Sequence, residues 1–424
     1  MTAQRTTLLI IFSALIAACT QDTSAPGVSL APSFARGGTE RNTIVVNPNA
    51  NGNGVAATIQ EGIDRVASGG MVLVKPGVYD ESVVINKGLT LQATGEGNGA
   101  VVIAPSSTVL NVIDVATTAP VTIRDVTLQY TGTNGIRGLG PVDITADNVS
   151  VIALNQPGAG NLIGVIQDAA DGTRARLVVR NSFLDGGINN ATPPLPQLFG
   201  LRVQGDVDVS FENNVIKRVG GACIFAFTRF DLGGAVNAEI LNNDLDQCHP
   251  TGRVAAILVG PAAGNLPTPT RPVTATGVVN IIGNRIQNSS TSCLPASAIA
   301  FEVGSGRIEN NHITSYVQSC AIPTARNLQG AIFVGRRQHP LFSSVNVSVR
   351  FNDINGNAFA GLRLGANQSR VIDASCNYWG SSDGPSGAGS GSGDAVITET
   401  GAAQPMFTPF ATAPIAGTGA TSCE

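Results

Sequence analysis

Seven short segments in the second half of the chain share one pattern, in which an asparagine and a variable residue precede an apolar residue. The asparagines are 25 to 41 residues apart, and the position three residues before each is also apolar or small. Alternation with a period of two predicts that each unit holds two short strands with one face inward and a turn at the asparagine. The asparagines are Asn181, Asn214, Asn243, Asn284, Asn311, Asn352 and Asn377.

A unit of this size cannot bury its apolar face by itself, so successive units must stack to close a core. Parallel stacking places equivalent residues about 4.8 Å apart. Asparagine tolerates the backbone dihedrals of turns, and stacked side-chain amides can hydrogen-bond along a column. The repeat therefore predicts a solenoid with an asparagine ladder and with longer loops inserted in some coils.

The first half of the chain is compatible with the same plan. The segment Thr58–Ala67 has apolar residues at helical spacing, with Thr58 as a candidate N-cap and Glu61 three residues later. Short apolar stretches such as Met71–Val74 and Leu89–Gln92 follow and read as strands. A helix before them would cover the open end of the first coil, where unpaired strand edges invite aggregation.

Two stretches carry a family resemblance. "KPGVYDESVVI" (Lys75–Ile85), within Gly69–Gly97, and the closing "CNYWGSSDGPSG" (Cys376–Gly387) resemble right-handed parallel β-helix proteins of the pectin-lyase-like class, over roughly residues 44–385. The resemblance implies an all-β fold, a single-stranded right-handed parallel β-helix with an N-terminal capping helix. The expected divisions are a strand and capping helix over 44–70, the β-helix over 71–385, and a C-terminal cap and tail over 386–424.

The N-terminus has the pattern of an export signal. An apolar run from Leu8 to Ala18 is too short to span a bilayer but suits a signal-peptide core. The segment Ile16–Cys19 resembles the lipobox of bacterial lipoproteins, which implies a signal peptide over 1–18 and lipidation of Cys19. Residues 20–43 are rich in Pro, Gly and Ser, so a flexible tether is expected over 19–43. The alternative is an ordinary secretory peptide with an incidental cysteine.

Six further cysteines allow disulfides in an exported chain. They allow fifteen connectivities, of which we expect the one that pairs nearest neighbours. Two of these separations match the length of one coil, which would place the partners close together. A metal site is the alternative, although no Cys-x-x-Cys is present. The expected pairs are Cys223 with Cys248, Cys293 with Cys320, and Cys376 with Cys423.

The fold class hosts lyases, hydrolases, esterases and non-catalytic adhesins, so it does not determine function. The second carboxylate of a pectin methylesterase and the motifs of polygalacturonases are absent. Elimination by a pectate lyase needs carboxylates that hold Ca²⁺ and a basic residue. Asp206, Asp208 and Asp246 are candidate Ca²⁺ ligands, but the family's signatures around them are missing. No other cofactor is indicated.

Alignment on the repeated asparagine yields one candidate site. The next position is expected to face outward, and in four consecutive units it carries Asp244, Arg285, His312 and Asp353. If these coils stack directly, the four residues form a stripe that could bind a ligand or transfer protons. The alternative is a surface ladder of alternating charges that contributes little energy.

Composition limits the partners. The net charge is −4 with no basic block, which argues against nucleic acid. We expect an exported, lipid-anchored β-helix of the bacterial envelope, at the outer membrane or cell surface, that binds polysaccharide or another extracellular partner without evident catalysis. A divergent Ca²⁺-dependent lyase of uronate polymers and a purely structural envelope protein are the alternatives. The sequence leaves the oligomeric state open.

Overall fold

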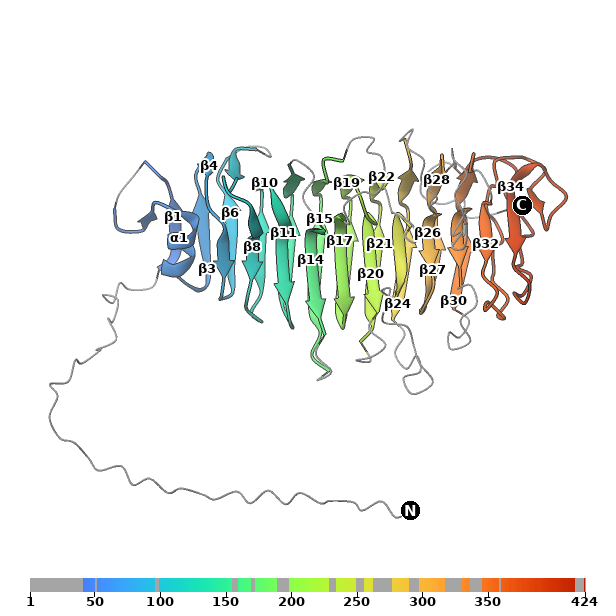
Figure 1. Cartoon of the computed structure of the whole chain (residues 1–424), viewed down its shortest axis with the longest axis horizontal. Helices are drawn as coiled ribbons and strands as arrows, with labels where there is room; N and C mark the ends of the chain where they lie inside the picture. The colour runs from blue at the N-terminus through green and yellow to red at the C-terminus, as the bar shows by residue number, and fades with distance from the viewer. Residues whose placement is uncertain are drawn as a thin grey trace, which may run out of the picture. The chain divides into compact units, whose positions relative to one another are not determined.

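The chain folds into a right-handed parallel β-helix, which confirms the expected fold class (Figure 1). The computed structural model describes residues 41–49, 52–95, 99–154, 159–168, 172–188, 198–228, 234–248, 255–261, 277–289, 297–316, 330–335, 345–357, 360–415 and 423. The expected signal peptide, Cys19, almost all of the tether, Cys293 and Cys320 lie outside these residues. The first strand begins at Arg41, inside the range expected for the tether.

Three parallel sheets form the walls of the solenoid, and each coil of the chain contributes a strand to each of them in turn. This differs from the expected two strands per unit. The third strand was missed because the connections on either side of it vary in length, so it does not align when the repeats are superposed on their asparagines.

Sheet A has twelve strands. They are β2 (Val55–Ala56), β1 (Arg41–Val46), β3 (Val66–Val74), β6 (Leu89–Ala93), β9 (Val121–Arg124), β12 (Asp143–Asp147), β15 (Ala175–Arg180), β18 (Val207–Glu212), β21 (Val236–Leu241), β24 (Val278–Ile282), β27 (Ser305–Glu309) and β30 (Asn346–Arg350).

Sheet B has ten strands. They are β4 (Gly77–Tyr79), β7 (Val101–Ile103), β10 (Thr127–Tyr130), β13 (Ser150–Ala153), β16 (Phe183–Asp185), β19 (Val215–Val219), β22 (Asp244–Cys248), β25 (Arg285–Gln287), β28 (His312–Thr314) and β31 (Asp353–Asn355).

Sheet C has twelve strands. They are β5 (Val83–Ile85), β8 (Val109–Val115), β11 (Gly132–Leu139), β14 (Gly160–Gln167), β17 (Leu198–Gly205), β20 (Ile224–Thr228), β23 (Ile257–Pro261), β26 (Ser297–Phe301), β29 (Gly330–Val334), β32 (Leu362–Leu364), β34 (Gly393–Thr398) and β33 (Pro385–Gly387).

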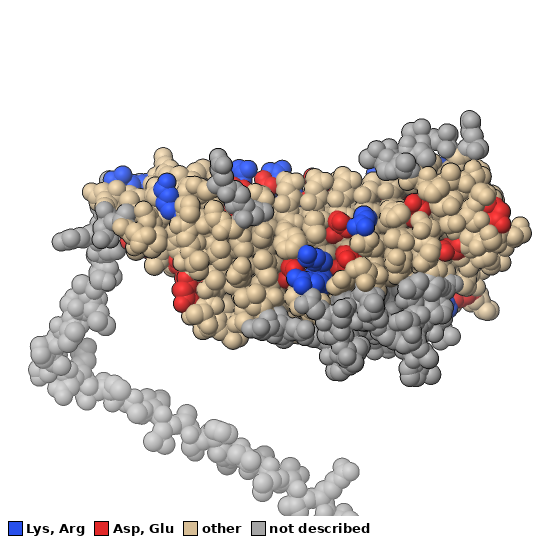
Figure 2. Space-filling view, turned by 90° about the horizontal axis from the view of Figure 1, so that it is seen from above, with Lys and Arg blue, Asp and Glu red and all other residues tan. Residues whose placement is uncertain are grey.

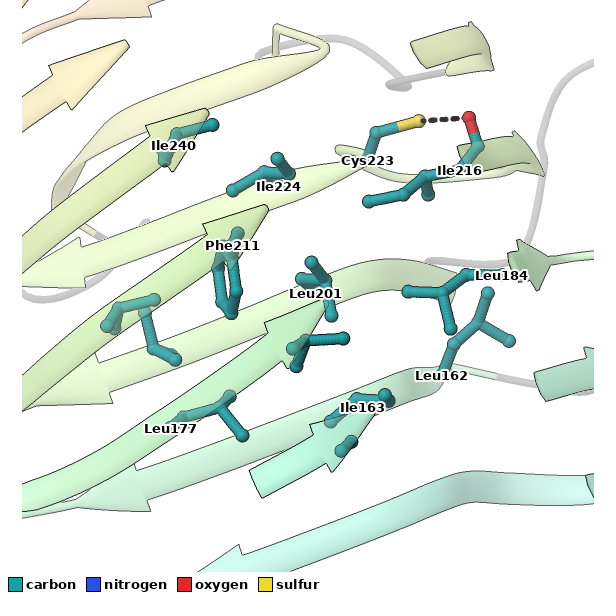
Figure 3. Packing of buried hydrophobic residues seen from close by; sticks show 14 of the residues in the cluster. Leu162, Ile163, Leu177, Leu184, Leu201, Phe211, Ile216, Cys223, Ile224 and Ile240 are labelled. Carbon is teal, nitrogen blue, oxygen red and sulfur yellow. Dashed lines mark hydrogen bonds between the residues drawn. The ribbon is translucent and has the colours of Figure 1, made fainter. Parts of the chain in front are cut away.

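Inward side chains from the three sheets form one continuous core. Figure 3 shows part of it, where aliphatic residues of neighbouring coils lie above one another around Phe211. Leu177, Leu201 and Ile216 are fully buried there, one from each sheet. Because burial of each such side chain stabilises a fold by about 1.5–3 kcal/mol, the stacked columns hold the coils together.

An asparagine ladder runs along the corner between sheets A and B. Each side-chain Nδ2 donates to Oδ1 of the next asparagine at 2.9 or 3.0 Å, and also to a backbone carbonyl of the preceding coil. Their side chains are buried and hydrogen-bonded along the column. The ladder consists of Asn214, Asn243, Asn284, Asn311, Asn352 and Asn377.

The prediction that Asn181 belongs to this ladder is wrong, because the ladder position in its coil is the next residue. Phe183 pairs with Val215, so Ser182 occupies the ladder column, and its backbone N–H donates to Asn214 Oδ1 at 3.1 Å. Asn181 instead has φ +54°. The same left-handed conformation occurs just before the ladder at Asn213. The turn and the ladder therefore use two successive positions, and asparagine occurs at both.

Helix α1 (Ile59–Arg65) covers the start of the solenoid, and Thr58 is its N-cap. Glu81 accepts hydrogen bonds from the backbone N–H groups of Ile59 and Gln60, at 2.7 and 3.0 Å. The Gln60 side-chain amide in turn pairs with both backbone groups of Val84 on the edge strand β5. Glu81 of "KPGVYDESVVI" thus holds the capping helix in place, because a carboxylate is favoured at a helix N-terminus. Among the described residues, no helix is long and apolar enough to cross a membrane.

Candidate functional site

The predicted stripe lies on the outer face of sheet B. Asp244, Arg285, His312 and Asp353 pair in register on the consecutive strands β22, β25, β28 and β31. Figure 2 looks down on this face, where acidic and basic side chains gather over the middle of the sheet.

Charges in this stripe are largely neutralised by their neighbours. Arg285 donates from Nη1 to Asp244 at 3.1 Å and from Nη2 to Gln287 at 2.6 Å. His312 Nδ1 lies 2.8 Å from Oδ2 of Asp353, a buried residue. Ion pairs between exposed groups contribute little. The stripe therefore fits a surface ladder of paired charges better than a binding site.

The candidate Ca²⁺ ligands already accept hydrogen bonds from neighbouring residues. Arg174 donates to Asp206 and Asp208 together, and its Nη2 also donates to two backbone carbonyls. Burial raises the pKa of Asp208, but hydrogen bonds from Arg174 and Asn237 outweigh it and hold that pKa below its usual range. Asp246 accepts from the backbone N–H and hydroxyl of Ser289. Within the described part of the chain, no group of three or more His, Cys, Asp or Glu could hold a metal ion.

Two disulfides are formed among the described residues. Cys223 is bonded to Cys248 across 25 residues, and both are buried. Cys376 is bonded to Cys423, which ties the end of the chain to the closing coil. These are the first and third of the pairs expected from the sequence.

Two arginines without an ion-pair partner among the described residues lie on a different face, the outer side of sheet C. Arg137 of β11 pairs in register with Gly164 of β14, and Gly164 pairs with Arg202 of β17. Two strand spacings separate the arginines, so their backbones are roughly 10 Å apart. Gly164, a buried residue without a side chain, lies between them in this column. We call Arg137, Gly164 and Arg202 the arginine notch.

Arg202 is held by aromatic rings. Its guanidinium carbon lies 5.4 Å from the ring centroid of Phe199 and 6.0 Å from that of Phe225. Nη2 donates to Gln204 at 3.0 Å, but the buried Nε has no hydrogen-bond partner among the described residues. Burial lowers the pKa of Arg202, and the charge of Asp168 opposes that shift. The side chain is therefore oriented by stacking, which leaves a donor for a ligand.

Arg137 is half-buried and forms no hydrogen bond or ion pair with the described residues. Beside it, Asn161 donates to Oδ1 of Asn134 at 2.9 Å, so two amides line the same end of sheet C. At Gly164 a Cβ would lie 3.0 Å from Asn161 Nδ2, so a larger residue would displace that amide. The arginine notch thus combines two cations whose guanidinium groups are donors suited to carboxylates.

These arginines were not predicted from the sequence, although they share a short sequence pattern. Gly-Ile-Arg at 135–137 and Gly-Leu-Arg at 200–202 and 361–363 repeat one pattern. Register places the third arginine, Arg363, in the same outward column, several coils further on. A search anchored on arginine instead of asparagine would have found this column.

No protein-family model matches the chain, and no curated protein matches it by sequence. Among solved structures, the chain is similar to the A-module of mannuronan C-5 epimerase AlgE4 from Azotobacter vinelandii. The sequence identity is 13%, the match covers 81% of this chain and 90% of that chain, and the TM-score is 0.36. A likeness of this size carries no argument about what this chain binds or does.

Proposed function

We propose that this protein binds acidic, uronate-containing polysaccharide at the arginine notch, without turning it over. The observation that carries the proposal is a pair of arginines in one column of sheet C, of which Arg137 has no hydrogen bond or ion pair with the described residues and Arg202 is held by aromatic rings. A guanidinium binds a carboxylate through two parallel hydrogen bonds, which adds both energy and orientation. A uronate polymer offers one carboxylate on every sugar, so both arginines can be engaged by one chain.

The surroundings of the notch favour binding over catalysis. Asp168 is the nearby carboxylate, and Gln204 Nε2 donates to both of its oxygens at 2.9 Å. A general base must be within reach of the proton that it removes, whereas this carboxylate is held against a neighbouring amide. No specific contact favours the Ca²⁺-dependent lyase, because Arg174 occupies its candidate ligands.

We expect Arg137→Gln to weaken binding of polygalacturonate about tenfold or more, since a charge-assisted hydrogen bond contributes about 1.5–3 kcal/mol. Isothermal titration calorimetry measures this directly. Arg176→Gln is the matched control, because Arg176 is an exposed arginine of sheet A paired with Asp143, and it should bind like the wild type. Neutral dextran should not displace polygalacturonate from either protein.

Equal affinities of the Arg137→Gln and wild-type proteins would overturn the arginine notch as the binding site. A parallel assay with Ca²⁺ follows the absorbance of unsaturated sugars. Product formed by the wild-type protein would overturn binding without turnover in favour of the lyase.

We also propose that the chain is exported and anchored by lipid at Cys19, supported by the apolar run and by the segment Ile16–Cys19. Expressed in a bacterium fed a labelled fatty acid, the wild-type chain should incorporate label and fractionate with membranes. Cys19→Ala should abolish both. Label retained by the variant would contradict the assignment.

A further inference from the structure

A polar pocket lies at the C-terminal end of the solenoid, away from the arginine notch. It has a volume of ≈ 320 Å³, and its lining includes Asn357, Trp379, Ser386, Ser392, Asp394 and Ala395. Three segments contribute to it: the turn after β31, the closing coil, and the strands β33 and β34. The pocket is near the lower end of the size range of small-molecule sites.

Glycines keep this pocket open. Gly380 has φ +84°, a left-handed conformation that other residues rarely adopt. A Cβ at Gly393 would lie 2.3 Å from the backbone oxygen of Trp379. The walls are therefore mostly backbone, and the few side chains that remain are polar.

Asp394 supplies a fixed acceptor. Its Oδ2 receives hydrogen bonds from the backbone N–H and the Nδ2 of Asn357, at 3.0 and 2.9 Å. Burial raises the pKa of Asp394, while these hydrogen bonds oppose the shift. A half-buried carboxyl that is so firmly oriented favours a ligand that offers hydroxyl donors over one that carries negative charge.

The serine hydroxyls are oriented as acceptors too. Ser392 Oγ donates to Asp383 at 2.9 Å, and Ser386 Oγ donates to the backbone oxygen of Gly393 at 2.8 Å. Because a hydroxyl has one hydrogen and two lone pairs, each oxygen keeps acceptor capacity for a ligand.

Trp379 belongs to both the pocket lining and the core. Its side chain is fully buried, and its indole Nε1 has no hydrogen-bond partner among the described residues. Because the indole has no accessible surface, it does not contact a ligand, but it lies close enough to the pocket to report on one.

We propose that this pocket binds one neutral sugar ring. Its hydroxyls would donate to Asp394 and to the serine oxygens. The arginine notch selects carboxylates, whereas Asp394 repels them, so the two sites would recognise chemically different parts of a glycan.

The test uses the single tryptophan of the chain. In a ¹⁵N-labelled sample, the indole N–H resonance belongs to Trp379 alone, and it can be followed during titration with galactose, glucose or galacturonate. We expect a saturable shift with at least one of the neutral sugars and none with galacturonate. Asp394→Asn should weaken the neutral sugar at least tenfold, and Ala395→Leu should abolish the response by filling the pocket.

Thermal melts establish that both variants are folded, and Arg176→Gln, far from the pocket, should respond like the wild type. An unchanged indole resonance with all neutral sugars, or a wild-type response in folded Ala395→Leu, would overturn the proposal. The two proposals fail separately, because the indole resonance reports on this pocket and polygalacturonate calorimetry reports on the arginine notch.

Discussion

Replacement of Asn311 by alanine should destabilise the protein by about 4 kcal/mol, because four hydrogen bonds of about 1 kcal/mol each are lost. Asn311 Oδ1 accepts from the backbone and side-chain nitrogens of Asn284, and its Nδ2 donates to Ile281 O and to Asn352 Oδ1. These partners are buried, so water cannot replace the lost contacts without opening the coil. The free energy of unfolding in urea measures the loss.

The matched control is Asn346→Ala, on the exposed end of β30, where the side chain accepts one hydrogen bond of 3.2 Å from Arg370. A surface change of this kind should cost no more than about 0.5 kcal/mol. Equal losses for the two variants would show that the asparagine ladder does not stabilise the stacking of coils.

Removal of the Cys223–Cys248 disulfide should have the second-largest effect on stability. The bond closes a loop of 25 residues, for which the chain-entropy model gives about 3.5 kcal/mol. Both cysteines are buried against the core, and Figure 3 shows Cys223 beside Ile216. We therefore expect the Cys223→Ala, Cys248→Ala double variant to unfold at a lower urea concentration than the wild type.

When both proteins are unfolded in the presence of a reducing agent, which also breaks Cys376–Cys423 in each, the wild type should approach the stability of the double variant. The double variant has no bond between positions 223 and 248 that the reductant could break. If it unfolds at the same urea concentration as the oxidised wild type, the disulfide does not constrain the unfolded chain as the model requires.

The fold could be predicted from the sequence because the turn between sheets A and B has the same structure in successive coils. At the A–B corner a turn residue precedes a buried amide, and this requirement repeats from Asn214 to Asn377. The error at Asn181 arose because asparagine suits both positions, and Ser182 fills the ladder column in that coil. The sequence pattern could not distinguish the turn position from the ladder position, whereas the hydrogen bonds in the structure do.

The binding face was harder to predict. The stripe through Arg285 and His312 follows the asparagines by one residue, so the same alignment brought it into register. Arg137 and Arg202 lie in sheet C, whose strands are joined to sheet B by connections of unequal length. Their proximity depends on the register between β11, β14 and β17, which only the folded structure supplies.

The central claim, that carboxylates of a uronate polymer bind at the arginine notch, is tested most directly by a crystal structure of the protein with a short galacturonate oligomer. We expect one carboxylate within hydrogen-bond distance of the Arg137 guanidinium and another in contact with Arg202, on either side of Gly164. An oligomer bound on another face, with both arginines untouched, would contradict the account.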